Sequence, residues 1–209
     1  MFGDYVTMKW WNDLWLNESF AEFTSTLATA EATEWKDAWA TFSSGEKSWA
    51  LRQDQLSTTH PIVAPINDLN DTYVNFDGIT YAKGASVLKQ LVFYVGREKF
   101  FKGINNYLNK HAYSNATLAD LLAELELTSG RDLKAWSAQW LEQSGINTIA
   151  TEVEENEMER FASLRCASPL RLSIRCCARI VWLSASTMRI RKPARSCVPT
   201  SSNLMLTAN

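Results

Sequence analysis

Apolar residues recur at helical spacing through most of the chain up to residue 144. From Asp13 onward, most of the apolar side chains fall on one face of a helix: Leu14, Leu16, Phe20, Phe23 and Leu27. The pattern predicts helices over residues 13–32, 33–51, 97–112, 117–129 and 131–144. We therefore expect a mainly α fold.

Residues that start and stop helices sharpen two of these predictions. Thr117, followed three positions later by Asp120, resembles a capping box, and Gly130 lies where that helix should end. Thr33 can cap the helix over 33–51. The apolar face of that second helix would consist of Trp35, Ala38, Trp39, Phe42 and Trp49. A tryptophan stripe is usually core, and a substrate-facing aromatic surface is the alternative for one or two of these residues.

Helical periodicity is lost in two regions. Residues 52–77 are rich in Pro, Asn and Asp, which is typical of a loop. Residues 149–154 alternate between apolar and polar, as a strand does. Residues 157–209 show no clean period, and we expect low order there.

The tail also differs from the rest of the chain in charge. Residues 161–209 contain no Asp or Glu and carry +8, so the net charge of −2 leaves −10 on the first 160 residues. All four cysteines lie in the tail, without a C-x-x-C pair that would indicate zinc: Cys166, Cys176, Cys177 and Cys197. We interpret the tail as a frameshifted or misassembled reading frame, with a basic nucleic-acid arm or a metal site as alternatives. We expect no nucleic-acid partner.

Glu18 is the first candidate functional residue, because it interrupts an apolar helix. A carboxylate in such surroundings needs a partner, since burying an unpaired charge costs several kcal/mol or shifts its pKa. An Arg or Lys side chain, a helix N-terminus or a metal ion could each serve, and the residues alone leave these alternatives open.

The residues around Glu18 carry a resemblance: Gly3-Asp4, Val6-Thr7-Met8, Trp10-Trp11, Asp13-Leu14-Trp15-Leu16-Asn17-Glu18 and Phe20-Ala21. This segment resembles the one that follows the zinc helix in aminopeptidase N-type zinc aminopeptidases, a gluzincin family. There, H-E-x-x-H supplies two histidine ligands and the general base, and the Glu of W-L-N-E is the third ligand. The resemblance implies that Glu18 is a ligand of Zn²⁺. The family spacing would place H-E-x-x-H before Met1, outside this sequence.

A second stretch, Phe76-Asp77-Gly78-Ile79-Thr80-Tyr81-Ala82-Lys83-Gly84-Ala85, resembles the F-D-x-I-x-Y-x-K-G-A motif of the same family. The resemblance implies that the Tyr81 hydroxyl stabilises the oxyanion of the tetrahedral intermediate. Gly84, Ala85 and Ser86 are small, which predicts close helix packing at that point. His60-Pro61-Ile62 resembles an H-P-I segment that leads toward the active site, and His60 is not expected to bind zinc.

The resemblance also implies a domain layout. Residues 1–148 would be the helical half of a thermolysin-like catalytic domain, residues 149–156 the start of a truncated β-sandwich domain, and 157–209 an unassigned basic tail. The implied function is that of a fragment of a zinc-dependent aminopeptidase, which removes N-terminal residues from peptide substrates with a metal-activated water. Without the two His ligands and the general base, the chain alone should be inactive.

Two other functions stay open. The chain could be a catalytically dead helical remnant or interaction module without metal, and relatives of this architecture also hydrolyse epoxides. The sequence has no apolar run of about 18 residues, so we expect no transmembrane segment. It has no basic and apolar leader either, so we expect a cytoplasmic location. Side-chain specificity and oligomeric state are not encoded in any pattern we recognise.

Overall fold

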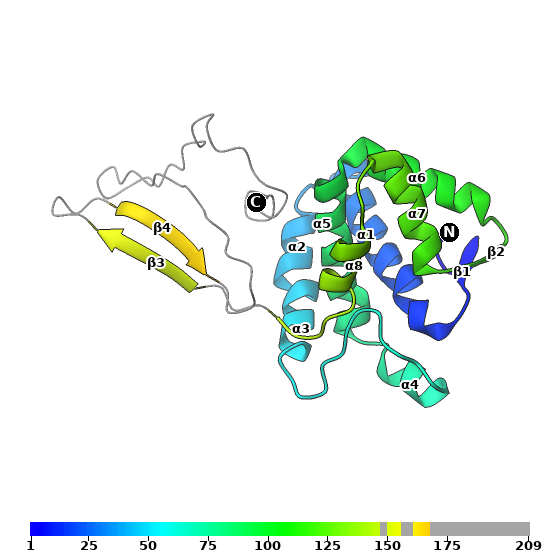
Figure 1. Cartoon of the computed structure of the whole chain (residues 1–209), viewed down its shortest axis with the longest axis horizontal. Helices are drawn as coiled ribbons and strands as arrows, with labels where there is room; N and C mark the ends of the chain where they lie inside the picture. The colour runs from blue at the N-terminus through cyan, green and yellow to red at the C-terminus, as the bar shows by residue number, and fades with distance from the viewer. Residues whose placement is uncertain (147–149, 156–160, 168–209) are drawn as a thin grey trace. The chain divides into compact units, whose positions relative to one another are not determined.

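The structure of the protein is a computed structural model that describes residues 1–146, 150–155 and 161–167 (Figure 1). The chain divides into two compact units, Met1–Ile146 and Asn147–Asn209. The first unit contains Glu18, Tyr81 and the segments that carry the resemblance.

Helices make up most of the first unit, and the expected mainly α fold class is confirmed. The α-helices are α1 (Leu14–Ala32), α2 (Ala38–Ser44), α3 (Glu46–Gln53), α4 (Leu69–Val74), α5 (Gly84–Val95), α6 (Arg97–Lys110), α7 (Leu118–Ser129) and α8 (Lys134–Trp140). A 3₁₀ helix, η1 (Trp11–Asp13), leads into α1, and a π-helix, η2 (Ile79–Lys83), leads into α5. Two short strands, β1 (Val6–Met8) and β2 (Ser114–Ala116), pair in parallel.

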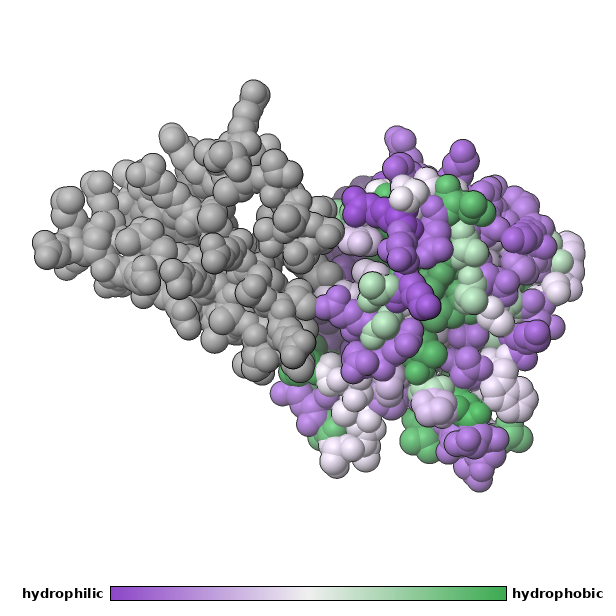
Figure 2. All heavy atoms as spheres, in the orientation of Figure 1, coloured by the Kyte–Doolittle hydropathy of each residue, from purple (hydrophilic) through white to green (hydrophobic). Residues whose placement is uncertain are grey.

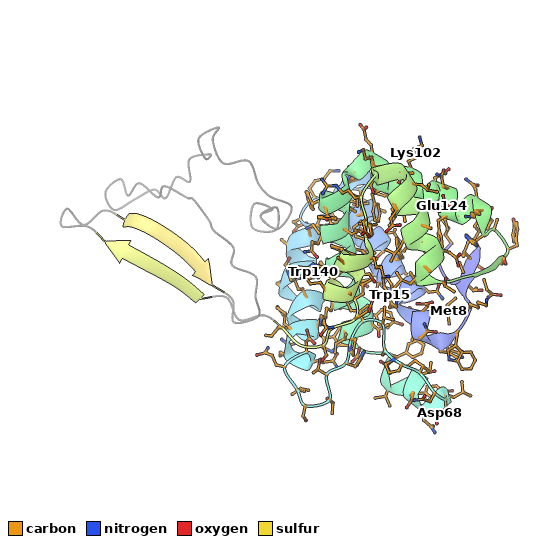
Figure 3. The ribbon with its side chains drawn as sticks, in the orientation of Figure 1. Met8, Trp15, Asp68, Lys102, Glu124 and Trp140 are labelled. Atoms are coloured by element: carbon orange, nitrogen blue, oxygen red, sulfur yellow. The ribbon has the colours of Figure 1, made fainter. Side chains whose placement is uncertain are left out.

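The core is built around α1, on the face that the sequence pattern predicts. Trp15, Phe20 and Phe23 are almost completely buried, and Trp15 lies among the helices in Figure 3. The ring of Phe100, from α6, lies 6.4 Å from that of Phe20 and 6.0 Å from that of Phe23. Full burial of large apolar side chains stabilises by about 1.5–3 kcal/mol each. The buried face fixes α1 in place, so it can serve as a scaffold for the polar residues that it also carries.

Asp13 joins the start of α1 to the start of α7. Its buried carboxylate accepts a hydrogen bond of 3.3 Å from the backbone N–H of Leu118, the first residue of α7. Burial raises the pKa of Asp13, and the hydrogen bond from Leu118 opposes that effect. A negative charge is favourable at a helix N-terminus, because the free N–H groups and the helix dipole point at it.

The capping box predicted for α7 is confirmed. The Thr117 hydroxyl accepts from the Asp120 backbone N–H at 3.4 Å, and the Asp120 side chain accepts from the Thr117 N–H at 2.9 Å. The helix ends at Gly130, which takes a left-handed conformation with φ of 70°. Glycine adopts this conformation at little cost because it has no Cβ.

The prediction of one helix over residues 33–51 is wrong. The chain forms two helices, α2 and α3, which meet at Gly45, and residues 33–37 lie outside both. Thr33 does not start a helix: it follows the last residue of α1, and its hydroxyl donates to the Thr29 carbonyl at 2.6 Å. A threonine can make such local hydrogen bonds at either end of a helix, so its presence alone does not show which end it marks.

The tryptophan stripe of this region is only partly core. Phe42 is buried, and Trp39 packs edge-on against it with ring centroids 5.6 Å apart. Trp35, in contrast, is 62% exposed, because it lies in the turn between α1 and α2. The helical spacing used for the prediction does not hold across that turn.

The predicted loop over 52–77 contains one element that the sequence did not reveal, the short helix α4. Asp68 caps it by accepting from the Asp71 N–H at 3.0 Å, and Asp68 lies at the lower tip of the unit in Figure 3. Leu69, Tyr73 and Val74 are exposed on this helix. Hydrophobic and hydrophilic spheres alternate at this end of the unit in Figure 2.

In the second unit, β3 (Ala150–Glu155) and β4 (Phe161–Ala167) pair antiparallel. β3 lies where the alternating pattern predicts a strand. β4 was not expected, because residues 157–209 show no clean period. The prediction of low order for the remainder of the tail, 168–209, lies outside the described residues. No helix in the described part of the chain is both long and apolar enough to cross a membrane.

Candidate active site

Glu18 lies on the first turns of α1, between the buried residues Asn17 and Ser19. It is itself half-buried, so its carboxylate lies near the surface of the unit rather than in its core. The helix position of Glu18 agrees with the sequence prediction, which places it on a helix that begins at residue 13 or 14.

The fold brings Tyr81 to Glu18, although 62 residues separate them in the sequence. The Tyr81 hydroxyl lies close enough to the Glu18 carboxylate for that carboxylate to raise the pKa of Tyr81. Burial raises the pKa of Tyr81 to about 12, and the Glu18 carboxylate adds to this effect through its hydrogen bond and its charge. The hydroxyl therefore keeps its proton at neutral pH. The two residues that the resemblance singled out thus share one site.

Tyr81 is carried by η2, whose π-helical geometry the sequence did not predict. Such segments are rare and often occur at functional sites. The Asp77 carboxylate accepts hydrogen bonds from the backbone N–H groups of Ile79, at 2.9 Å, and Thr80, at 3.1 Å. The backbone N–H of Gly78 is held by the Gln53 side chain of α3. The start of η2 is therefore tied down by side chains on both sides.

Close packing between α1 and the start of α5 sets the separation of Glu18 and Tyr81. The Ser19 hydroxyl donates to the Thr80 carbonyl at 2.5 Å. A Cβ atom on Gly84 would lie only 1.9 Å from the Ser19 hydroxyl oxygen. The close packing predicted from the small residues is confirmed, and Gly84 is the residue that allows it.

A buried ion pair secures the other end of η2. Lys83 lies 2.7 Å from the carboxylate of Asp54, which is only 2% exposed. Asp54 also accepts from the Thr59 hydroxyl at 2.6 Å and from the Gly145 N–H at 3.0 Å. One carboxylate thus joins η2 to the loop after α3 and to the segment after α8.

His60 lies beside the site without reaching the Glu18 carboxylate. Its Nε2 atom is 3.1 Å from Asp77 Oδ2, and its Nδ1 atom is 2.7 Å from the Pro61 carbonyl. His111 is remote from this arrangement, at the end of α6, where its ring packs against Tyr107. The two histidines therefore contact different residues.

Sequence reasoning missed several residues that shape the site. Asp77, Asp54 and Ser19 were not singled out, because each has a partner that lies 17 to 91 positions away in the chain. Glu22 was missed as well: it adds to the field on the Tyr81 hydroxyl, and burial raises its own pKa, with repulsion from Glu46 adding to the shift. Glu22 lies one helical turn after Glu18, and that spacing was the only available signal.

Whether these residues can hold a zinc ion depends on how many ligand side chains they bring together. A protein zinc site needs three or four side-chain ligands. Among residues 1–146, no group of three or more His, Cys, Asp or Glu side chains is placed to hold a metal. Glu18 supplies a carboxylate of the required kind, but these residues do not form a complete site by themselves.

The Peptidase family M1 domain matches residues 1–140. The chain belongs to this family. It is 61% identical over 155 residues to "Aminopeptidase N" of Streptomyces lividans, covering 73% of this chain and 18% of that protein. It is 46% identical over 164 residues to "Probable aminopeptidase 2" of Sulfurisphaera tokodaii, covering 77% and 21%.

A third relative, "Tricorn protease-interacting factor F2" of Thermoplasma acidophilum, is 43% identical over 156 residues, covering 75% of this chain and 20% of that protein. The chain thus spans about a fifth of the length of the curated relatives that it matches. The resemblance to aminopeptidase N-type gluzincins is confirmed by these matches and by the family domain.

Proposed function

We propose that this M1 family chain supplies part of the active site of a zinc-dependent aminopeptidase, acting on the N-termini of peptides. The observation that carries the proposal is the meeting of Glu18, from α1, with Tyr81, from η2. The relatives named aminopeptidase support the reaction class.

Tyr81 is suited to donate a hydrogen bond to the carbonyl oxygen of a peptide. Its pKa of about 12 keeps the phenol protonated at neutral pH, and its attachment to η2, which Asp77 anchors, limits the positions it can take. A phenolic O–H is a directional donor. A donor aimed at the charge that develops on a carbonyl oxygen typically stabilises the transition state by about 3–4 kcal/mol.

Glu18 would act as one ligand of the zinc ion. A bound zinc lowers the pKa of its water and polarises a carbonyl. Because the described residues do not complete the ligand set, the remaining ligands and the general base would come from the H-E-x-x-H segment that the family resemblance implies. In this proposal, the chain supplies the helix α1, which carries Glu18, and the hydrogen-bond donor Tyr81, which faces Glu18.

The proposal can be tested by exchange with a relative. Residues 1–140 of this chain would replace the matching segment of the Streptomyces lividans aminopeptidase N, and hydrolysis of an alanyl chromogenic substrate would be measured. In an active chimera, Tyr81→Phe should lower kcat by about 10²–10³-fold with zinc content unchanged. Glu18→Gln should lower the zinc content itself.

Two matched variants serve as controls. Tyr73→Phe removes a phenolic hydroxyl from a residue that is 74% exposed on α4, and Glu31→Gln removes a carboxylate from the far end of α1. Both should leave kcat and zinc content close to those of the chimera. A Tyr81→Phe chimera with unchanged kcat would contradict the role proposed for Tyr81, and retained zinc in Glu18→Gln would contradict the role proposed for Glu18.

A further inference from the structure

His60 has two hydrogen-bond partners that can only accept. Its Nδ1 atom lies 2.7 Å from the Pro61 carbonyl oxygen, and its Nε2 atom lies 3.1 Å from a carboxylate oxygen of Asp77. A carbonyl and an ionised carboxylate have no proton to give. Both ring nitrogens must therefore donate, and a histidine that donates from both nitrogens is a cation.

Asp77 connects this cation to the segment that carries Tyr81. Its Oδ2 atom faces His60, while its Oδ1 atom accepts from the N–H groups of Ile79 and Thr80, the first two residues of η2. The Asp77 backbone carbonyl also accepts from the Tyr81 N–H at 3.1 Å. Any change in the position of Asp77 is thus passed to the backbone from Ile79 to Tyr81.

We propose that His60 is a positioning residue for Tyr81: as an imidazolium it holds Asp77, and Asp77 in turn holds the start of the π-helix in the geometry that directs the Tyr81 hydroxyl toward Glu18. The importance of this for catalysis rests on the proposed function. The positioning itself is a property of the chain as it stands, and it can be measured without zinc or substrate.

The surroundings of His60 favour the charged form of its ring. The side chains of His60 and Asp77 are each 16% exposed, so water screens their attraction only in part. Burial by itself lowers the pKa of His60, but the hydrogen bonds to Asp77 and Pro61 and the charge of Asp77 outweigh burial and the opposing charge of Lys83. The net result is a raised pKa. In the described residues, Asp77 and Lys83 are the charged groups whose fields act on this ring.

The raised pKa of His60 decides how the stability of the fold depends on pH. A histidine whose pKa is raised by folding stabilises the fold fully below its ordinary value of about 6.5, and this stabilisation is lost as the pH rises through the folded-state value. Above that pH the ring is neutral and can donate to only one of its two partners. The hold on Asp77 then weakens, and the start of η2 should open more often.

The first test is the protonation of His60 itself, followed by ¹⁵N NMR of the ring nitrogens during a pH titration. The chain has two histidines, so a His111→Gln variant makes the assignment direct. We expect both His60 nitrogens to carry protons at pH 6.5 and the ring to lose one only at higher pH. A ring that is mostly neutral at pH 6.5 would overturn the proposal.

Asp77→Asn tests the partner, because it keeps an oxygen to cap η2 but removes the negative charge. It should lower the pKa of His60 below that of the parent chain. Asp68→Asn is the matched control: Asp68 caps α4 in the same way, and no interaction links it to His60. An equal shift in both variants would show that the effect does not pass through the His60–Asp77 contact.

The second test is amide hydrogen exchange at Ile79 and Thr80. In the parent chain, protection of these amides, corrected for intrinsic rates, should fall by about tenfold as the pH rises through the pKa of His60, the size expected for one hydrogen bond to a charged group. His60→Gln keeps a neutral donor, so it should fold but show protection that does not vary with pH. Protection that is independent of pH in the parent chain would overturn the proposal.

These readouts separate the two proposals. If the chimera is inactive while His60 titrates and the amides respond as expected, the positioning role stands and the proposed function fails. The opposite result is an active chimera that Tyr81→Phe impairs, with protection of the Ile79 and Thr80 amides that does not change when His60 is protonated. In that case the proposed function stands and the positioning role is wrong.

Discussion

Gly84 shows how one residue sets the geometry of the candidate site. It lies where α5 begins against α1, and its missing side chain leaves room for the Ser19 hydroxyl, which donates to the Thr80 carbonyl. Glu18 precedes Ser19 directly, and Tyr81 follows Thr80 directly. The contact between the two inner residues therefore fixes the distance between the two outer ones.

Gly84→Ala should destabilise the unit, because its Cβ would lie 1.9 Å from the Ser19 hydroxyl oxygen and 2.8 Å from the Ser19 Cβ. Overpacking of this kind costs about 1–3 kcal/mol. Urea denaturation would measure the loss in the free energy of unfolding. Ser86→Ala, in the same helix, is the control, since the Ser86 hydroxyl only bonds the Ala82 carbonyl one turn back.

Ser19→Gly should rescue part of that loss by removing both atoms that clash. The double variant should therefore be more stable than the sum of the two single changes predicts, which is the signature of residues in direct contact. Strict additivity of the two free energies would show that the contact is absent.

At the scale of elements, the residues at the two ends of a helix decide where it begins and stops. α7 begins with a full capping box and stops at a left-handed glycine, and both features could be predicted from the sequence. The expected helix over 33–51 failed because the pattern of apolar residues continues across a turn at Gly45. Periodicity identifies a helical face, but it does not show whether one helix or two contribute to it.

Thr117→Ala should cost about 1 kcal/mol, because it leaves the first N–H groups of α7 without the hydroxyl acceptor. The loss would be measured by thermal or urea denaturation. Thr128→Ala, near the other end of the same helix, is the matched control: its hydroxyl bonds only carbonyls one turn back, and the change should be close to neutral. Similar losses in both variants would argue against the cap.

At the scale of the whole molecule, the chain matches about a fifth of the length of its relatives, and one unit of it brings Glu18 and Tyr81 together. The first unit buries its own core of aromatic and aliphatic side chains. The site residues are attached to that core through α1 and η2. The unit therefore holds Glu18 near Tyr81 through its own packing.

The chain by itself should bind zinc weakly and should not hydrolyse an alanyl chromogenic substrate, because the described residues offer no group of three ligands. Metal analysis after gel filtration in buffer with added zinc would give the zinc content, and a spectrophotometric assay would give the rate. One zinc per chain that disappears in Glu18→Gln, together with hydrolysis, would contradict this expectation.

The sequence alone determined the mainly α class, the span of α1, the cap of α7, and Glu18 and Tyr81 as candidates, because these depend on local periodicity and on short motifs. The tertiary structure decided everything that depends on distant partners. His60 meets Asp77, Lys83 meets Asp54, and the Ser19 hydroxyl reaches the backbone beside Tyr81. The type of a side chain and its position in the sequence do not reveal a partner that only folding brings near. The network that holds Tyr81 could therefore be found only in three dimensions.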